Sequence, residues 1–245
     1  MKSNAFRLGA ALAAIVVALA ACSVSDPPDP TIGRSPDRLY AAPKDEMSAP
    51  NYPKAAELLS KLESRYPFGR WAQQAQIEIA WAHYKDGERA LALSAIDRFL
   101  RLHPEHPALD YALYLKGLIN FNEQQGLIAW LGRQDLAERD LQAARESFDT
   151  FKQLITRFPE SKYAPDAEAR MTYLVASMAR GEMLIARYYF QRGAYVAAAN
   201  RAQEVVRKYD RAPAVEAALA ILVHSYDKLG MTELRDDARR VLDRN

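Results

Sequence analysis

Residues 87–107 read GERALALSAIDRFLRLHPEHP, and this stretch decides the fold. Counting back four, seven and eleven positions from His103 gives Phe99, Ile96 and Ala92. These offsets lie on one face of an α-helix. The glycine before the segment and the proline after it indicate where a helix begins and ends. The stretch therefore predicts an amphipathic helix between a glycine turn and a proline stop.

The same pattern occurs four times along the chain. We call the last residue of each pattern the repeat-end residue; the four are Tyr66, His103, Phe158 and Tyr209. Four positions earlier stand Leu62, Phe99, Leu154 and Val205; seven earlier, Leu59, Ile96, Phe151 and Ala202; eleven earlier, Ala55, Ala92, Ser147 and Ala198. A small residue at the third position indicates close approach of a neighbouring helix. Gly87, Gly193 and Gly230 stand at the ends of further helices, where a left-handed residue closes a turn.

Helix, glycine turn, helix and proline are typical of the tetratricopeptide repeat, a unit of 34 residues. Pro67 and Pro104 are 37 residues apart, which nearly fits. Pro104 and Pro159 are 55 apart, so we expect an insertion of about 20 residues, placed around 122–140. The 51 residues from Pro159 to Asp210 predict a long helix over about 164–192. The fold class predicted for residues 37–245 is all-α, a right-handed α-solenoid of about five tetratricopeptide repeats.

The two end repeats are weaker than the others. Pro43 and Pro50 are expected to interrupt the first helix of the first repeat. In the last repeat, the second helix (about 232–244) offers the core only four residues: Leu234, Ala238, Val241 and Leu242. That composition suits a terminal repeat, because no following repeat has to be covered.

The N-terminus has the pattern of a bacterial lipoprotein signal peptide, residues 1–21. A positive start and a short apolar segment precede Leu19-Ala20-Ala21-Cys22, which fits the cleavage site of such peptides. Cys22 is the only cysteine, so it cannot form an intramolecular disulfide, and we expect it to carry the lipid. Residues 22–36 are rich in proline and aspartate and predict a flexible tether. The alternative is an ordinary secretory peptide with a chance cysteine.

Composition and motifs exclude several classes of function. Lys and Arg total 33 and Asp and Glu total 31, so there is no basic excess to displace phosphate counterions, and we expect no nucleic-acid partner. No nucleophile elbow, phosphate-binding loop, dinucleotide glycine pattern or HExxH occurs, so we predict no catalytic residues and no cofactor. His103 and His106 lack the further ligands that a zinc site needs, so no metal site is predicted.

Beyond the repeat pattern, three blocks resemble the BamD (ComL) family of the outer-membrane β-barrel assembly machinery. They are RYPFG at 65–69, AIDRF at 95–99 and RLHPEHP at 101–107. The resemblance extends through Gly117 and Tyr188 to Arg201 and covers nearly all of the chain after the signal peptide.

The resemblance implies a lipid-anchored scaffold on the periplasmic face of the outer membrane. Its partners would be BamA, other lipoproteins of the machinery, and the carboxy-terminal β-signal of unfolded outer-membrane proteins. By the same resemblance, Tyr66, Pro67 and Phe68 would contact the client. Arg201, Arg192 and Tyr195 would contact BamA.

Other interpretations remain open at this point. A Tyr-Pro at a repeat end also serves turn and core packing, and an arginine on a repeat helix is often only solvated. A tetratricopeptide lipoprotein that organises cell-wall synthesis or division, or an accessory subunit of an envelope enzyme, would share the lipid and the repeats. The apolar segment around Trp130 either packs on the solenoid or contacts a partner.

Overall fold

The computed structural model describes residues 33–121 and 134–244, the side chains of 134–140 excepted, and every regular element in these residues is a helix. The helices are α2 (Pro36–Ser48), α3 (Tyr52–Arg65), α4 (Arg70–Lys85), α5 (Arg89–Leu102), α6 (Leu109–Asn120), α7 (Gln134–Arg157), α8 (Ala164–Gln191), α9 (Tyr195–Lys208), α10 (Val215–Lys228) and α11 (Thr232–Leu242). None of these helices is both long and apolar enough to cross a lipid bilayer.

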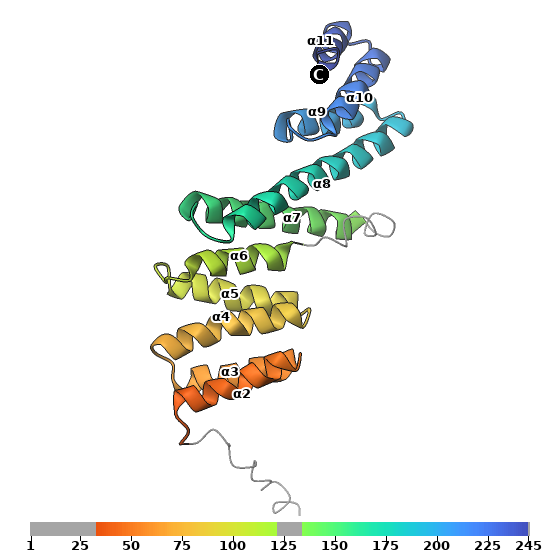
Figure 1. Ribbon diagram of the computed structural model, residues 1–245. Helices are drawn as coiled ribbons and strands as arrows, with labels where there is room; N and C mark the ends of the chain where they lie inside the picture. The colour runs from red at the N-terminus through yellow and green to blue at the C-terminus, as the bar shows by residue number, and fades with distance from the viewer. Residues whose placement is uncertain (1–32, 122–133, 245) are drawn as a thin grey trace, which may run out of the picture.

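The helices pair in chain order, and the pairs stack along one direction (Figure 1). Each even-numbered helix is the first of a pair, and the next odd-numbered helix runs back beside it. Across the described residues this gives five pairs, each packed on the next. The predicted all-α solenoid of tetratricopeptide repeats is therefore confirmed.

The predicted register is confirmed by burial. All the residues four, seven and eleven positions before a repeat-end residue are at most 1% exposed. The backbone N–H of each repeat-end residue donates to the carbonyl four residues earlier, at 2.8–2.9 Å, so α3, α5, α7 and α9 end at equivalent places. Gly87, Gly193 and Gly230 have φ angles of 82°, 74° and 71°, the left-handed conformation that a helix-terminating glycine takes.

The third and fourth repeats contain the long helices. α8 has 28 residues and spans the predicted range. α7 has 24 residues and begins at Gln134, so residues 134–140 of the expected insertion form the start of this helix. The rest of that insertion, with Trp130, lies outside the described residues, as do the signal peptide and Cys22.

Two expectations about the end repeats were wrong. Pro43 does not interrupt the first helix: it lies inside α2, where it and Leu39 are the buried residues, four apart on one face. Packing of that face compensates for the backbone hydrogen bond that a proline cannot make. In α11, Leu234 and Val241 are 47% and 49% exposed, and Ala238 is the buried residue. Within the described residues no helix packs over the other two.

The buried side chains form two clusters that meet at α6. Ala112 and Leu115 of this helix belong to the N-terminal cluster and Leu113 to the C-terminal one. α6 packs closely against α7 at Gly117, whose carbonyl accepts a hydrogen bond from the Ser147 hydroxyl at 2.9 Å. A Cβ at position 117 would stand 2.3 Å from Cε1 of Phe151, a ring with no exposed surface.

We therefore expect Gly117→Ala to destabilise the fold by about 1–3 kcal/mol, because the ring cannot withdraw from a packed core. Urea unfolding of the two proteins measures the difference. Gly181→Ala is the matched control: Gly181 also lies inside a helix, and its added Cβ would meet nothing within 4 Å. The control should gain about 0.5–1 kcal/mol from helix propensity. Equal effects of the two substitutions would contradict close packing at Gly117.

Candidate protein-interaction sites

The two sets of predicted site residues lie at different ends and on different edges of the stack. The loops after the second helices of the repeats gather along one edge, and the turns within the repeats along the other (Figure 1). Tyr66, Pro67 and Phe68 lie in the loop between α3 and α4, residues 66–69, on the first edge. Arg192 and Tyr195 flank the turn between α8 and α9 on the second edge. A ligand at one site therefore leaves the other uncovered.

The loop between α3 and α4 is built differently from its three equivalents. Five residues separate His103, Phe158 and Tyr209 from the next helix, and the N–H of the third of them donates back to the repeat-end carbonyl at 2.8–3.2 Å. After Tyr66 only three residues intervene, and Gly69 has a φ of 85°. The shorter loop leaves Phe68 88% exposed, the highest value among the large hydrophobic side chains described.

Tyr66 and Phe68 consequently have different environments. The Tyr66 ring is partly buried against the N-terminal cluster, and its hydroxyl donates to the Arg34 carbonyl at 2.9 Å. Tyr66 thereby ties the segment before α2 to the end of α3. Phe68 has no such anchoring and presents its ring to solvent. Because the Phe68 ring is exposed, it adds little burial free energy to folding. Phe68 is therefore the residue of this loop that is available to a ligand.

An aromatic and cationic patch surrounds the turn between α8 and α9. The Arg192 guanidinium lies 5.3 Å from the ring centre of Tyr188, which is 53% exposed. The Tyr195 ring meets Phe190 edge to face at 5.4 Å. Val196 is 55% exposed. Exposed aromatic, arginine and aliphatic groups in one place are typical of a protein interface.

Arg201 does not belong to that patch. It lies about 9 Å further along α9 than Tyr195. Its guanidinium is 3.3 Å from Oε2 of Glu182, a carboxylate whose side chain is only 3% exposed. Arg145 of α7 is 3.7 Å from the other carboxylate oxygen. Two cations from α7 and α9 thus neutralise a buried acid of α8, and Arg201 has a structural task beside any contact with a partner.

Sequence reasoning missed a row of aromatic and charged side chains on α6 and α8. Tyr114 stacks on Tyr163 at 4.7 Å, and its hydroxyl donates to Asp166 at 2.7 Å. Arg170 Nε donates to the same carboxylate at 2.6 Å, and its guanidinium lies 4.7 Å from the Phe121 ring. In the sequence these tyrosines look like ordinary apolar positions of a helix, so only the three-dimensional arrangement identifies the row.

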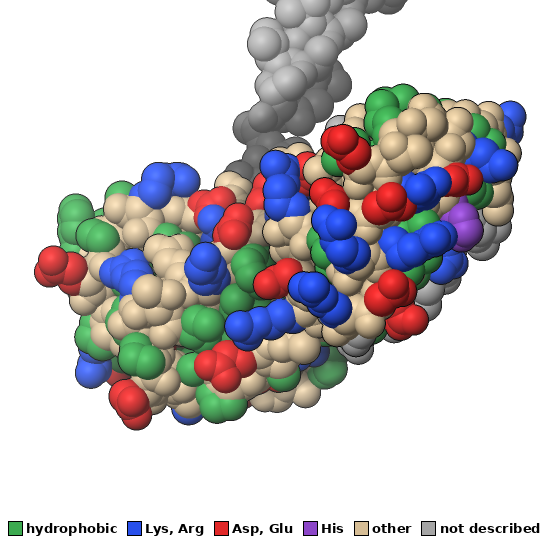
Figure 2. Space-filling model, turned by 90° about the horizontal axis from the view of Figure 1, so that it is seen from above, with side chains coloured by type: hydrophobic (Ala, Val, Ile, Leu, Met, Phe, Trp, Pro, Cys, Tyr) green, Lys and Arg blue, Asp and Glu red, His purple; other side chains and the backbone are tan. Residues whose placement is uncertain are grey.

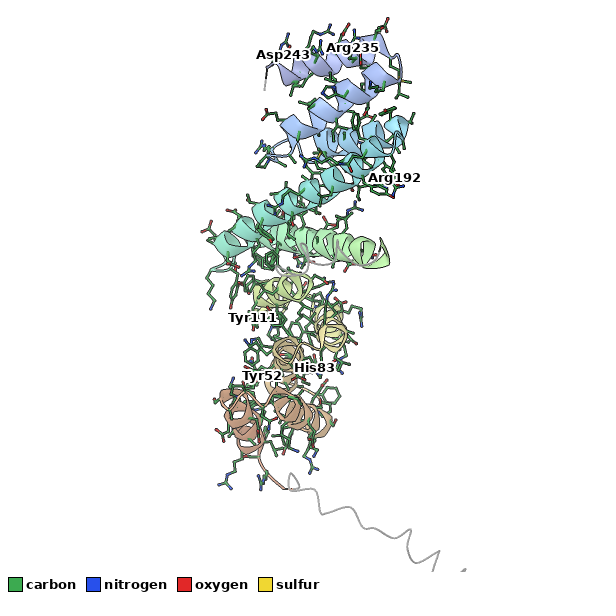
Figure 3. The ribbon with its side chains drawn as sticks, turned by 90° about the vertical axis from the view of Figure 1, so that its right-hand side faces the viewer. Tyr52, His83, Tyr111, Arg192, Arg235 and Asp243 are labelled. Carbon is green, nitrogen blue, oxygen red and sulfur yellow. The ribbon has the colours of Figure 1, made fainter. Side chains whose placement is uncertain are left out.

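Two groups at this row have shifted pKa values. Tyr111, labelled in Figure 3, adjoins the row, with its ring centre 5.5 Å from that of Tyr163. Burial, followed by the neighbouring Tyr163 and the Glu78 carboxylate, raises the pKa of Tyr111 to about 12, so its hydroxyl keeps its proton at neutral pH. Burial acts to raise the pKa of Asp166, but the hydrogen bonds from Arg170 and Tyr114 outweigh it and hold that pKa below its usual value. The row therefore holds an internally paired charge, Asp166 with Arg170, and the protonated Tyr111 hydroxyl lies beside it.

His103 and His106 form hydrogen bonds within the fold and pack against the Phe99 ring. His103 Nε2 lies 2.9 Å from the Gln76 side-chain oxygen, and Nδ1 of His106 accepts a hydrogen bond from the Ala108 backbone N–H at 3.1 Å. Burial, with the nearby His103, lowers the pKa of His106. No group of three potential metal-binding side chains occurs among the side chains that the structure describes, those of residues 33–121 and 141–244.

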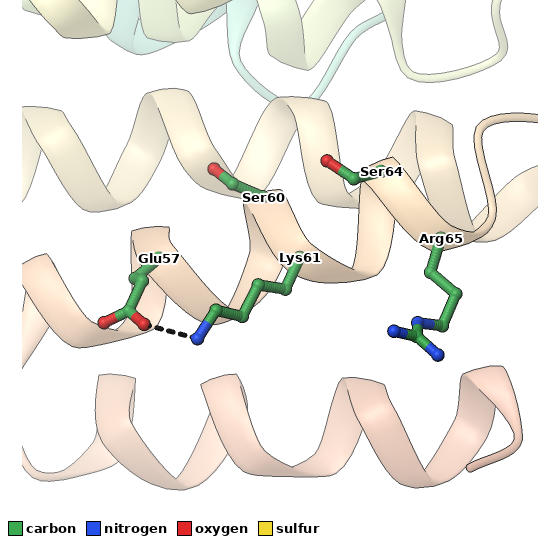
Figure 4. A pocket seen from close by; sticks show the side chains of 5 residues that line it. All are labelled: Glu57, Ser60, Lys61, Ser64 and Arg65. Carbon is green, nitrogen blue, oxygen red and sulfur yellow. Dashed lines mark ion pairs between the residues drawn. The ribbon is translucent and has the colours of Figure 1, made fainter. Parts of the chain in front are cut away.

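The remaining surface features are polar and mixed in charge. A hollow along α3 is lined by Glu57, Ser60, Lys61, Ser64 and Arg65 (Figure 4), and Lys61 Nζ lies 2.7 Å from a Glu57 oxygen. Viewed from above, the stack shows Lys and Arg interspersed with Asp and Glu over the visible face (Figure 2). Neither feature singles out a ligand.

Comparison with known proteins identifies the class of protein. The family model described as outer membrane lipoprotein (YfiO) matches residues 33–241, the whole solenoid from its first turn to its last helix. The chain therefore belongs to this outer-membrane lipoprotein family.

Several curated relatives carry one particular name, outer membrane protein assembly factor BamD. The relative from Neisseria meningitidis serogroup A is 49% identical over 94% of this chain and 87% of its own length. The relative from Vibrio cholerae is 34% identical over 91% and 92%. Among solved structures, kinesin light chain TPR-like repeats from Podosopora anserina are 15% identical with a TM-score of 0.37, covering 85% of this chain and 96% of that one. At that score the assignment of tetratricopeptide repeats rests on the helix pairing and register alone.

The contacts of Arg201 lead to a prediction about stability. Arg201→Glu would place a second carboxylate beside buried Glu182, with only Arg145 left to compensate, so we expect a loss of about 1–3 kcal/mol. Urea unfolding measures it. Glu182→Gln combined with Arg201→Glu should recover most of the loss, since the repulsion is then removed. Arg180→Glu, an exposed change on the same helix as Glu182, is the charge-matched control and should cost less than about 0.5 kcal/mol. An Arg201→Glu protein as stable as the control would show that the pair is unimportant for folding.

Proposed function

We propose that this protein is a lipid-anchored, non-catalytic scaffold of the outer-membrane β-barrel assembly machinery. In this role it binds BamA together with other lipoproteins of the machinery, and it receives the β-signal of unfolded outer-membrane proteins. The observation that carries the proposal is the 49% identity to an assembly factor named BamD, which extends over 94% of the chain. Similarity of that extent includes both candidate sites, not the repeat pattern alone.

The anchor is part of the same proposal. Cys22, freed at its amino group by removal of residues 1–21, carries the lipid and holds the solenoid at the periplasmic face of the outer membrane. A stable anchor needs about two acyl chains, which lipoprotein maturation supplies at a single cysteine. Residues 22–36 then separate the membrane from α2.

Client binding is assigned to the loop between α3 and α4, with Phe68 as its principal contact. A β-signal is an extended segment that usually ends in an aromatic residue, and an exposed phenylalanine ring can stack against such a residue. Pro67 fixes the backbone beside it. Tyr66 supports the loop through its hydrogen bond to the Arg34 carbonyl. Because Tyr66 and Phe68 have different roles, substitutions at the two residues should have different effects.

We expect Phe68→Ala to weaken binding of a peptide with an aromatic-terminated β-signal by about tenfold, equivalent to about 1.4 kcal/mol. Its folding stability should stay within about 0.5 kcal/mol of the parent, because the ring is exposed. Tyr66→Phe should do the reverse: it removes one hydrogen bond and costs about 0.5–1.5 kcal/mol of stability, with little effect on the peptide. Fluorescence anisotropy and urea unfolding test both. Unchanged peptide affinity in Phe68→Ala would exclude Phe68 as the client contact.

BamA docking is assigned to the patch around the turn between α8 and α9, with Arg192 and Tyr195 as direct contacts. Arg201 lies outside that patch and extends the docking surface along α9 with the exposed part of its side chain, while its guanidinium is paired with Glu182. The Arg192 guanidinium lies over the Tyr188 ring and is in no ion pair among the described residues, so it can be altered without disturbing one. Arg192 is therefore a cleaner probe of docking than Arg201.

We expect wild-type protein purified from detergent-solubilised membranes to carry BamA, and Arg192→Glu to lose most of it, since a reversed charge at an interface costs several kcal/mol. The variant should still bind the β-signal peptide, because each repeat contacts mainly its neighbours. Recovery of a cell-division protein or a murein enzyme in place of BamA would contradict the proposal and favour a cell-wall role. Loss of peptide and BamA together would contradict two separate sites.

A further inference from the structure

A groove on the second-helix side of the stack has an excess of positive charge. It lies between α5 and α7 with α6 as its floor, and Leu100, Arg101, Lys116, Gln153 and Arg157 are among its lining residues. Its volume of about 430 Å³ is enough for a few side chains of a partner. We call it the α5–α7 groove.

The positive charge of the groove is only partly compensated. Three cations line it, against the single carboxylate of Asp97. Lys116 Nζ lies 2.7 Å from that carboxylate, which leaves the two arginines. The Arg157 guanidinium lies 5.4 Å from the Phe158 ring, and neither it nor Arg101 forms an ion pair with any residue that the structure describes. Two guanidinium groups therefore face the groove without a carboxylate partner.

The floor between these cations is apolar. Leu109 and Leu113 of α6 are 3% and 2% exposed and line the groove, and Leu100 of α5 is partly buried beside them. An apolar floor flanked by arginines matches a ligand that presents an aliphatic or aromatic group next to an acid. Arginine suits this task because its planar fork binds a carboxylate with two parallel hydrogen bonds.

In the preceding repeat, a carboxylate of the protein itself joins the neighbouring helices. Glu63, three residues before the repeat-end residue Tyr66, accepts hydrogen bonds from Gln76 Nε2 at 2.9 Å and from Arg98 at 2.8 Å. This carboxylate joins α3, α4 and α5. Three residues before His103 the equivalent position is Leu100, so the α5–α7 groove has no acid at this position, and its one carboxylate, Asp97, is paired with Lys116.

We propose that the α5–α7 groove binds an acidic segment of a partner protein, in which Asp or Glu stands next to an aliphatic or aromatic residue. The carboxylate lies between Arg101 and Arg157 and supplies from a partner the kind of acid that Glu63 supplies internally one repeat earlier. The apolar neighbour covers Leu113. This groove is separate from the Phe68 and Arg192 sites. The proposal that it binds an acidic segment rests on the charges of the groove and does not depend on the proposed function.

A crosslinking experiment tests the proposal on the full lipid-anchored chain in detergent. Benzoylphenylalanine replaces Gln153 at the groove, and the probe is a fluorescent peptide Ser-Gly-Leu-Glu-Glu-Leu-Gly-Ser, blocked at both ends. Its analogue carries Gln in place of both Glu. We expect the acidic peptide to crosslink at least about tenfold more than the analogue, a difference of about 1.4 kcal/mol. The yield should fall as salt is raised from 0.01 to about 0.15 M, as screening predicts.

Charge-reversal variants complete the test. Arg101→Glu with Arg157→Glu should abolish crosslinking of the acidic peptide and gain crosslinking of a peptide with Lys in place of Glu, which an unfolded protein would not do. Arg180→Glu with Arg211→Glu, the same charge change at exposed positions away from the groove, should behave as the parent. Equal crosslinking of the acidic and amide peptides, no crosslinking of either, or equal loss in the control variant would each overturn the proposal.

Discussion

One packing contact organises the whole chain: a residue without exposed surface, eleven positions before each repeat end, against which the neighbouring helix packs. At Ala55, Ala92 and Ala198 the residue is alanine, and at Ser147 it is serine, whose hydroxyl bonds to the Gly117 carbonyl. Helix axes can approach closely only where side chains are small. The position of this residue fixes which face of each second helix turns inward, and the repeat-end residue then fixes where that helix stops.

Loops are the variable part of this arrangement, and the candidate sites lie where a loop departs from the common form. In three of the loops between repeats, five residues follow the repeat-end residue and form the same backbone turn, whereas only three follow Tyr66, and this leaves Phe68 in solvent. The turn within the fourth repeat also departs from the common form. Because α8 is longer than the other first helices, the turn that contains Arg192 lies farther out than theirs (Figure 1). Irregular loops on a regular scaffold thus place ligand contacts without altering the core.

Much of the fold could be predicted because the register depends on local spacing. Residues four, seven and eleven before a repeat end share a helix face whatever the rest of the chain does. The predictions for Pro43, Leu234 and Val241 failed for a different reason: burial there depends on which element lies opposite, and spacing within one helix does not contain that information. Pro43 is buried and stays helical, while Leu234 and Val241 are about half exposed among the residues that the structure describes.

The candidate sites show the same limit at the level of single side chains. Tyr66 and Phe68 are two residues apart in the sequence, and Arg192 and Arg201 are nine apart. The sequence alone therefore does not show which residue of each pair is structural and which is free to bind a ligand. Tyr66 is anchored by a carbonyl 32 residues away, and Arg201 by a carboxylate 19 residues away on another helix. Such partners come together only when the helices stack. Long-range contacts therefore distinguish a surface residue from a structural residue of the same type. Phe68 and Arg192 have no such long-range anchor among the described residues. Substitutions at these two residues can therefore alter binding while the fold is kept.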